Sequence, residues 1–91
     1  MPDQMDARNK YYEWTNDLFG SLPFDLKYAN LISLACALVM GNPGAIKYFY
    51  KAASKSGASE AEIAAAIDVT NAATGLNIYA LMRDIETPAQ A

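Results

Sequence analysis

The stretch that decides the fold is residues 31–53, LISLACALVMGNPGAIKYFYKAA. Its first half places apolar residues at helical spacing, and its second half repeats that spacing after the tetrapeptide Gly-Asn-Pro-Gly. Gly41 suits the left-handed end of one helix, and Asn42 suits the cap of the next helix, with Pro43 at its first position. The sequence therefore predicts two neighbouring antiparallel helices joined by a tight corner.

The sequence on both sides of this stretch also predicts helices. Ser59 with Glu62 three residues later matches a capping box, which predicts a helix that begins there and ends before Gly75. No segment alternates polar and apolar residues over strand length and carries turn signals. We predict an all-α, compact domain of five to six helices, with the antiparallel pair at its centre. The five predicted helices cover residues 3–19 (or 6–19), 26–40, 43–56, 59–74 and 76–86.

The chain is expected to form a single domain over residues 1–91, with residues 1–5 and 87–91 frayed. Hydrophobic residues make up 53% and charged residues 19%, and the formal net charge is −3. The seven basic residues are dispersed, so nucleic acid is not an expected partner. Because neither a signal peptide nor an apolar run of membrane-spanning length is present, we expect no membrane association and a cytoplasmic protein.

The chain lacks the residues of common metal and cofactor chemistry. It has no histidine, and its single cysteine, Cys36, allows neither an internal disulfide nor a Cys-x-x-Cys pair. We therefore predict no metal site and no cofactor.

The helix over residues 26–40 is apolar on more than one side. Ile32, Cys36 and Val39 form a second stripe beside the core-facing one. We expect Cys36 to be buried there as a small hydrophobic residue. Two apolar faces on one helix predict a homo-oligomer, formed through this helix and the aromatic first helix.

Residues 24–69, FDLKYANLISLACALVMGNPGAIKYFYKAASKSGASEAEIAAAIDV, resemble the carboxymuconolactone decarboxylase and alkyl hydroperoxidase D superfamily. In that pattern a helix ends at a corner of small residues, a helix carrying K-A-x-x-x-G-A-S-x-x-E-I follows, and an alanine-rich helix comes next. The residues that carry the resemblance are Lys51-Ala52, Gly57-Ala58-Ser59, Glu62-Ile63 and Ala66. The resemblance implies the helical fold and assembly into trimers or hexamers, and the homo-oligomer that we predict is a dimer, a trimer or a hexamer.

The chain departs from the family pattern where the chemistry would be. In the redox branch a Cys-x-x-Cys begins the helix after the corner, a His follows four residues later, and a Glu lies on the preceding helix. Here the matching positions hold Asn42 and Ala45, Phe49, and Asn30. The thiols would attack and the His and Glu would relay protons, so none of that chemistry is available. The decarboxylase branch also uses the His, which is likewise absent.

The resemblance therefore implies a degenerate ligand site with no catalytic residue. Tyr48 and Tyr50 flank Phe49, and their hydroxyls offer contacts for the polar end of a ligand, although core packing or a subunit interface is the commoner role of such tyrosines. Tyr50 is included in the predicted site. The predicted site residues are Asn30, Asn42, Ala45, Phe49 and Tyr50. The expected ligand is an apolar small molecule.

Three functional classes stay open from the sequence. The first is a catalytically silent oligomeric protein that binds a ligand or serves as a scaffold. The second is a divergent peroxidase or decarboxylase-like enzyme that uses Cys36 or unrecognised residues, against which the missing His and second Cys count. The third is a non-catalytic subunit that pairs with an intact homologue.

Overall fold

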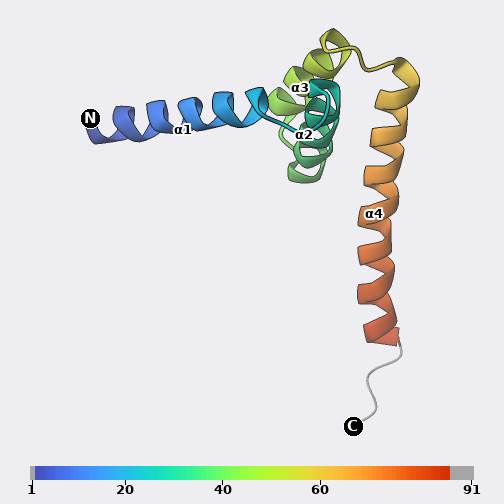
Figure 1. The fold of residues 1–91 in the computed structure, drawn as a ribbon. Helices are drawn as coiled ribbons and strands as arrows, with labels where there is room; N and C mark the ends of the chain where they lie inside the picture. The colour runs from blue at the N-terminus through green and yellow to red at the C-terminus, as the bar shows by residue number, and fades with distance from the viewer. Residues whose placement is uncertain (1, 87–91) are drawn as a thin grey trace.

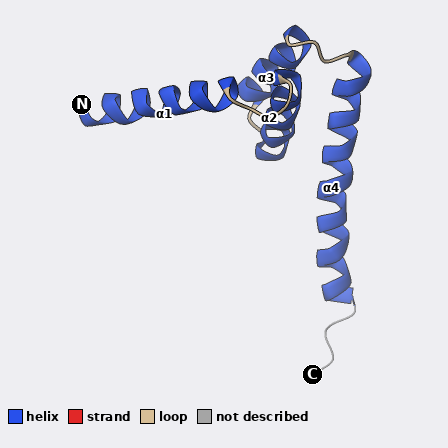
Figure 2. Ribbon diagram, viewed as in Figure 1, coloured by secondary structure: helices blue, strands red, loops and turns tan. Residues whose placement is uncertain are grey.

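The computed structural model describes residues 2–86, and every regular element in that range is a helix (Figures 1 and 2). The helices are α1 (Pro2–Gly20), α2 (Leu26–Met40), α3 (Pro43–Lys55) and α4 (Glu60–Glu86). The all-α prediction is confirmed, and the helix number is corrected from five or six to four. Residues 2–5, expected to be frayed, belong to α1, whereas Met1 and residues 87–91 lie outside the described residues.

The number of helices differs because Gly75 does not end a helix. The glycines with a positive φ among the described residues are Gly41 and Gly57, so Gly75 keeps ordinary helical geometry within α4. A glycine inside a helix costs about 1 kcal/mol relative to alanine. The neighbouring alanines and Leu76 favour helix, and no proline follows within the described range to stop it.

The helices α2 and α3 form the predicted antiparallel hairpin. Gly41 takes the left-handed conformation at φ 68°, and its N–H donates to the carbonyl of Ala37 at 2.9 Å. Asn42 caps α3, because its side-chain oxygen accepts from the N–H of Ala45 at 3.2 Å. At the other end of the hairpin, the start of α2 is bonded to the end of α3 through Asn30.

The core lies where α2, α3 and the first turns of α4 meet. Leu34, Ala53, Ala58 and Ile63 are buried there, and four larger side chains pack against them while staying partly exposed: Leu31, Leu38, Ile46 and Phe49. Four of the six buried hydrophobic residues in the described chain are alanines. Because the hydrophobic effect scales with the apolar area removed from water, such a core stabilises a single chain weakly.

The helix α4 begins beside the start of α2 and extends beyond the end of α2. The predicted capping box is confirmed: Glu62 N–H donates to Ser59 Oγ at 3.1 Å, and Ser59 N–H donates to Glu62 Oε1 at 2.9 Å. Glu62 also pairs with Lys27 in the first turn of α2. With 15 residues in α2 and 27 in α4, α4 extends about 18 Å beyond the end of α2. We call residues 75–86 the α4 arm.

The chain is extended, and the predicted compact shape is wrong. The helices α1 and α4 leave the hairpin in different directions (Figure 1), and the radius of gyration is 17.7 Å. A compact domain of this length has a radius of about 12 Å. The accessible surface is 7262 Å², about 2,000 Å² more than a folded monomer of this mass exposes. None of the helices within residues 2–86 is both long and apolar enough to span a membrane.

Candidate functional site

The structure places the five predicted site residues in three settings. Asn42 and Ala45 lie at the hairpin corner, Asn30 and Phe49 line a cleft beside α1, and Tyr50 lies outside that cleft. Along α3, Ala45 comes one turn before Phe49. Asn30 is level with Ala52, whose carbonyl it contacts, so it lies about one turn beyond Phe49.

At the corner, the start of α3 is closed by its own cap. Asn42 offers a neutral amide whose oxygen already accepts from the Ala45 N–H at 3.2 Å. The Ala45 side chain is a methyl group and can neither attack nor transfer a proton. A helix N-terminus stabilises a thiolate when a thiol is present, but this one holds only a structural cap.

Asn30 ties α2 to the end of α3. It is 7% exposed and is the buried polar residue of the described chain. Its Nδ2 donates to the carbonyl of Ala52 at 3.3 Å and to Ser56 Oγ at 3.1 Å. Ser56 Oγ in turn donates to the Ala52 carbonyl at 2.8 Å. Because the Ala52 carbonyl can only accept, a carboxylate at this position would lose that bond and could keep only a contact with Ser56 Oγ, whose hydroxyl can donate.

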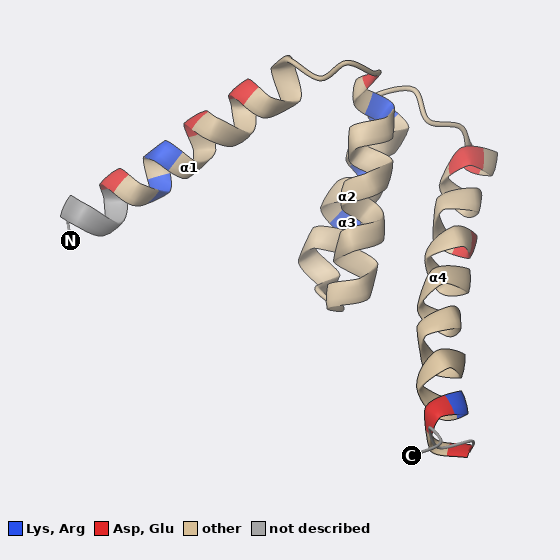
Figure 3. Ribbon diagram, turned by 60° about the horizontal axis from the view of Figure 1, so that its bottom comes forward, with Lys and Arg blue, Asp and Glu red and all other residues tan. Residues whose placement is uncertain are grey.

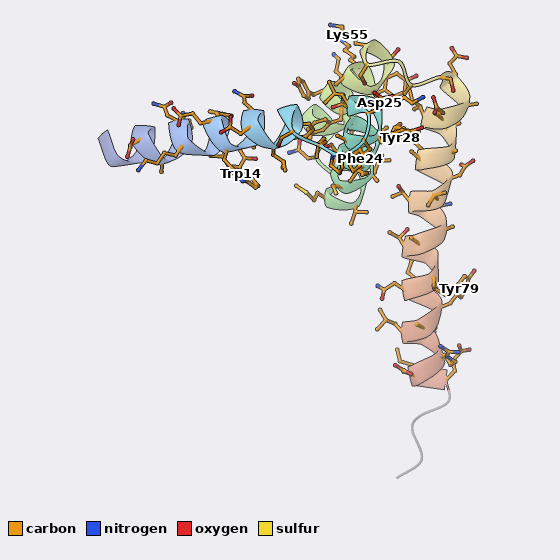
Figure 4. All side chains as sticks on the ribbon, in the orientation of Figure 1. Trp14, Phe24, Asp25, Tyr28, Lys55 and Tyr79 are labelled. Atoms are coloured by element: carbon orange, nitrogen blue, oxygen red, sulfur yellow. The ribbon has the colours of Figure 1, made fainter. Side chains whose placement is uncertain are left out.

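The cleft between α1 and the hairpin has a volume of about 610 Å³. We call it the aromatic cleft, after the rings that line it: Tyr11, Tyr12, Phe19, Tyr48 and Phe49. The rings of Tyr48 and Phe49 meet edge to face with centroids 5.0 Å apart. Lys55 is the charged residue of the lining. Figure 4 labels it at the end of α3. Such a lining suits a ring-bearing apolar molecule with an anionic end.

The sequence does not predict the α1 residues that line the aromatic cleft. The α1 aromatics were assigned to a subunit interface, because helical spacing alone does not say which side of α1 faces the hairpin. The only sequence signal was the density of rings in residues 11–14, YYEW. The ring of Tyr50 was expected beside Phe49 in the site, yet Tyr50 is half exposed and Tyr48 takes the place in the lining.

Cys36 is exposed, so the prediction that it is buried is wrong for the single chain. The reason is that its whole stripe on α2 is uncovered. Ile32 and Val39, one turn away on either side, are 56% and 63% exposed. The helices of the same chain pack on the other side of α2 and leave this stripe exposed.

The ion pair of Lys27 and Glu62 lies outside the lining of the aromatic cleft. The pKa of Glu62 is lowered, first by the N–H of Ser59 and then by the hydrogen bond from Lys27. The pKa of Lys27 is raised, mainly by that same bond to Glu62. Among the described residues, no three His, Cys, Asp or Glu side chains gather as metal ligands.

Comparisons with known proteins agree with the resemblance predicted from residues 24–69. Searches of curated proteins and of solved structures found no significant match. The sequence profile of the carboxymuconolactone decarboxylase family matches residues 6–82, which extend from α1 into the α4 arm. This match covers most of the chain, and we conclude that the chain belongs to the carboxymuconolactone decarboxylase family.

Proposed function

We propose that this protein is a catalytically silent member of its family, which assembles with further copies of itself and binds an apolar small molecule. The observation that carries the proposal is the closed start of α3. There, Asn42 caps the helix and Ala45 supplies only a backbone N–H. A redox protein of this family would carry its two thiols at those positions.

The residues at the family's His and Glu positions, Phe49 and Asn30, also support the absence of catalytic activity. Phe49 packs against the core cluster of Leu34 and Ala53, where it adds apolar contact and no titrating proton. Asn30 uses its amide to hold the end of α3. Each replacement gives the hairpin a packing contact or a hydrogen bond where the family would place a reactive group.

The assembly part of the proposal is supported by the shape and the core. A chain whose buried residues are mostly alanines and whose surface is 7262 Å² leaves a large apolar area in water. Association removes such area and stabilises both copies. The exposed rings of Trp14 and Tyr79 (Figure 4) are among the apolar groups left uncovered in the single chain.

The binding part of the proposal is supported by the aromatic cleft. A volume of about 610 Å³ falls within the range of small-molecule sites. A fluorescent naphthalene sulfonate serves as the probe, since it combines rings with an anionic group. We expect Tyr12→Ala, in the lining, to weaken its binding several-fold. Tyr79→Ala, which removes an exposed ring outside the cleft, serves as the matched control. Equal effects of the two substitutions would contradict the cleft as the binding site.

Activity assays test the catalytic silence. We expect no dithiol-dependent turnover of hydrogen peroxide above that of Cys36→Ala, and no turnover of a carboxymuconolactone. The reason is that a Cys-x-x-Cys peroxidase resolves its oxidised thiol with its own second cysteine, and this chain has a single cysteine.

One observation favours a second candidate, a divergent thiol enzyme. Cys36 is exposed, so a peroxide could reach it and an external thiol could complete the cycle. Peroxide turnover that disappears in Cys36→Ala would establish this candidate and overturn the catalytic silence.

A further inference from the structure

The face of α4 that packs on α2 continues, uncovered, along the α4 arm. Ile63 on this face is 4% exposed in the core. Helical spacing carries the same face on to Ile78, Leu81 and Ile85, and these side chains are 58%, 57% and 70% exposed. We call these three residues the arm stripe. Figure 1 shows that the arm runs past the end of the hairpin, where no part of the described chain covers it.

A second uncovered surface lies on α2. Ile32, Cys36 and Val39, which we call the α2 stripe, are all exposed. The first residue of this stripe, Ile32, lines a groove of about 380 Å³ between α2 and α4, together with Tyr28 and Val69. Figure 4 shows Tyr28 between the hairpin and the first turns of α4. The groove is lined almost entirely by apolar side chains and lies open along α2.

The two stripes match in length and in charge. Each covers eight residues, 32–39 and 78–85, which is about 10 Å along a helix axis. Residues 28–46 and 69–82 contain no charged side chain. Figure 3 shows this as the uncoloured body of α2 and the uncoloured middle of α4. Joining these two charge-free ranges buries no unpaired charge, and the charged residues of the arm, Arg83, Asp84 and Glu86, lie at its Ile85 end.

We propose that the α4 arm of one copy packs on the α2 stripe of a second copy, and that the second copy returns its arm in the same way. This inference rests on the assembly part of the proposed function and names the contact that forms it. A two-fold contact is reciprocal, so it covers both surfaces of both chains at once. The excess surface of about 2,000 Å² per chain exceeds the roughly 800 Å² per partner that a standard stable interface buries.

The arrangement places Leu81 of one copy against Cys36 of the other. Each is the middle residue of its stripe, so they meet whether the two helices run parallel or antiparallel. Within one chain they cannot meet. Lys27 pairs with Glu62 at the start of both helices, so Cys36 is level with Asn71, about 15 Å along the axis from Leu81. A disulfide needs Cα atoms within about 7 Å.

Cross-linking is therefore the sharpest test. The full chain carrying Leu81→Cys is oxidised mildly and then analysed by gel electrophoresis without reductant. We expect a covalent dimer that reductant removes and that disappears in Leu81→Cys with Cys36→Ala, since the bond joins positions 81 and 36. Tyr79→Cys, on the same arm but off the arm stripe, is the matched control and should give much less dimer. Absence of dimer from Leu81→Cys, or equal dimer without Cys36, would overturn the inference.

A second measurement needs no cross-link. Leu81 is exposed in the single chain, so Leu81→Asp removes no contact within it. We expect light scattering to give at most half the wild-type mass for Leu81→Asp and the wild-type mass for Tyr79→Asp, with helical circular dichroism retained in both. An unchanged mass for Leu81→Asp would refute arm exchange.

The outcomes separate the two proposals. If the wild type is an oligomer and Leu81→Asp has the same mass, arm exchange is wrong, but the proposed oligomer is not contradicted. A wild type that sediments as a 9.9 kDa single chain at micromolar concentration removes both. Peroxide turnover removes the catalytic silence and leaves arm exchange unaffected.

Discussion

The ammonium group of Lys27 lies 3.0 Å from Oε2 of Glu62, and this pair joins the first turn of α2 to the first turn of α4. Glu62 also closes the capping box with Ser59. One carboxylate therefore serves two contacts, one within α4 and one between helices.

The first prediction concerns pH. The pKa of Glu62 is lowered in the folded chain from its ordinary value of 4.5, so its contribution to stability is complete above that pH. The contribution is lost as the pH falls through the folded-state pKa. We expect Glu62→Gln to unfold at lower urea than wild type at pH 7, with the difference shrinking toward pH 3. Glu60→Gln, two residues earlier in the same first turn, should show a smaller effect, because Glu60 makes neither the Ser59 nor the Lys27 contact of Glu62. Equal losses at pH 7 and pH 3 would contradict the ionic role.

The second prediction concerns Asn30. Asn30→Ala removes two hydrogen bonds to α3 and should cost about 1–2 kcal/mol of unfolding free energy. Asn30→Asp should cost more at pH 7 than at pH 4, because it sets a carboxylate against the Ala52 carbonyl in a buried place. Urea unfolding at both pH values measures this. A more stable Asn30→Asp protein would mean that Asn30 is not a structural tie.

The third prediction uses one substitution at two glycines. Gly75 is helical, and a Cβ built there meets nothing within 4 Å, so Gly75→Ala should stabilise the protein by up to about 1 kcal/mol. Gly41 has the same free space but φ of +68°, so Gly41→Ala should destabilise it by about 1 kcal/mol. Thermal unfolding at equal protein concentration compares the two. Destabilisation by Gly75→Ala would indicate that α4 is broken at Gly75.

The fourth prediction asks whether the start of α3 keeps its electrostatic character. In a Cys36→Ala background, Asn42→Cys places a thiol at the positive end of α3, and Ser54→Cys places one near the opposite end. We expect the pKa of the first thiol to be the lower of the two, because the N–H of Ala45 is released from the cap and helix N-termini favour a thiolate. The pH dependence of alkylation rates reports both pKa values. An equal pH dependence would show that loss of the cap has disordered the helix start.

Features that depend on contacts between residues close together in the chain could be predicted from the sequence. The corner at Gly41 and Asn42 and the capping box at Ser59 depend on contacts within a few residues, and the structure contains each of them. The core stripe through Leu34 and Ala53 was predictable because helical spacing identifies an apolar face.

Features that depend on distant parts of the chain could not be predicted. Gly75 is a local exception: a glycine is typical of a helix end, but the residues on both sides of it continue the helix. Cys36 lies in an apolar stripe, yet spacing does not say whether the neighbour that covers it belongs to the same chain. The aromatic cleft depends on the direction in which α1 leaves the hairpin, and no local pattern determines that angle. The role of Asn30 needed the position of Ala52 on the facing helix.

The charge-free lengths of α2 and α4 have a kinetic consequence. Residues 28–46 and 69–82 present no charge to an approaching copy, so long-range electrostatic attraction does not guide the encounter between the surfaces proposed to meet. Unsteered protein association proceeds at about 10⁵–10⁶ M⁻¹s⁻¹, and its rate then changes little between low and high ionic strength. Discrimination between correct and incorrect partners would rest on the fit of side chains at close range.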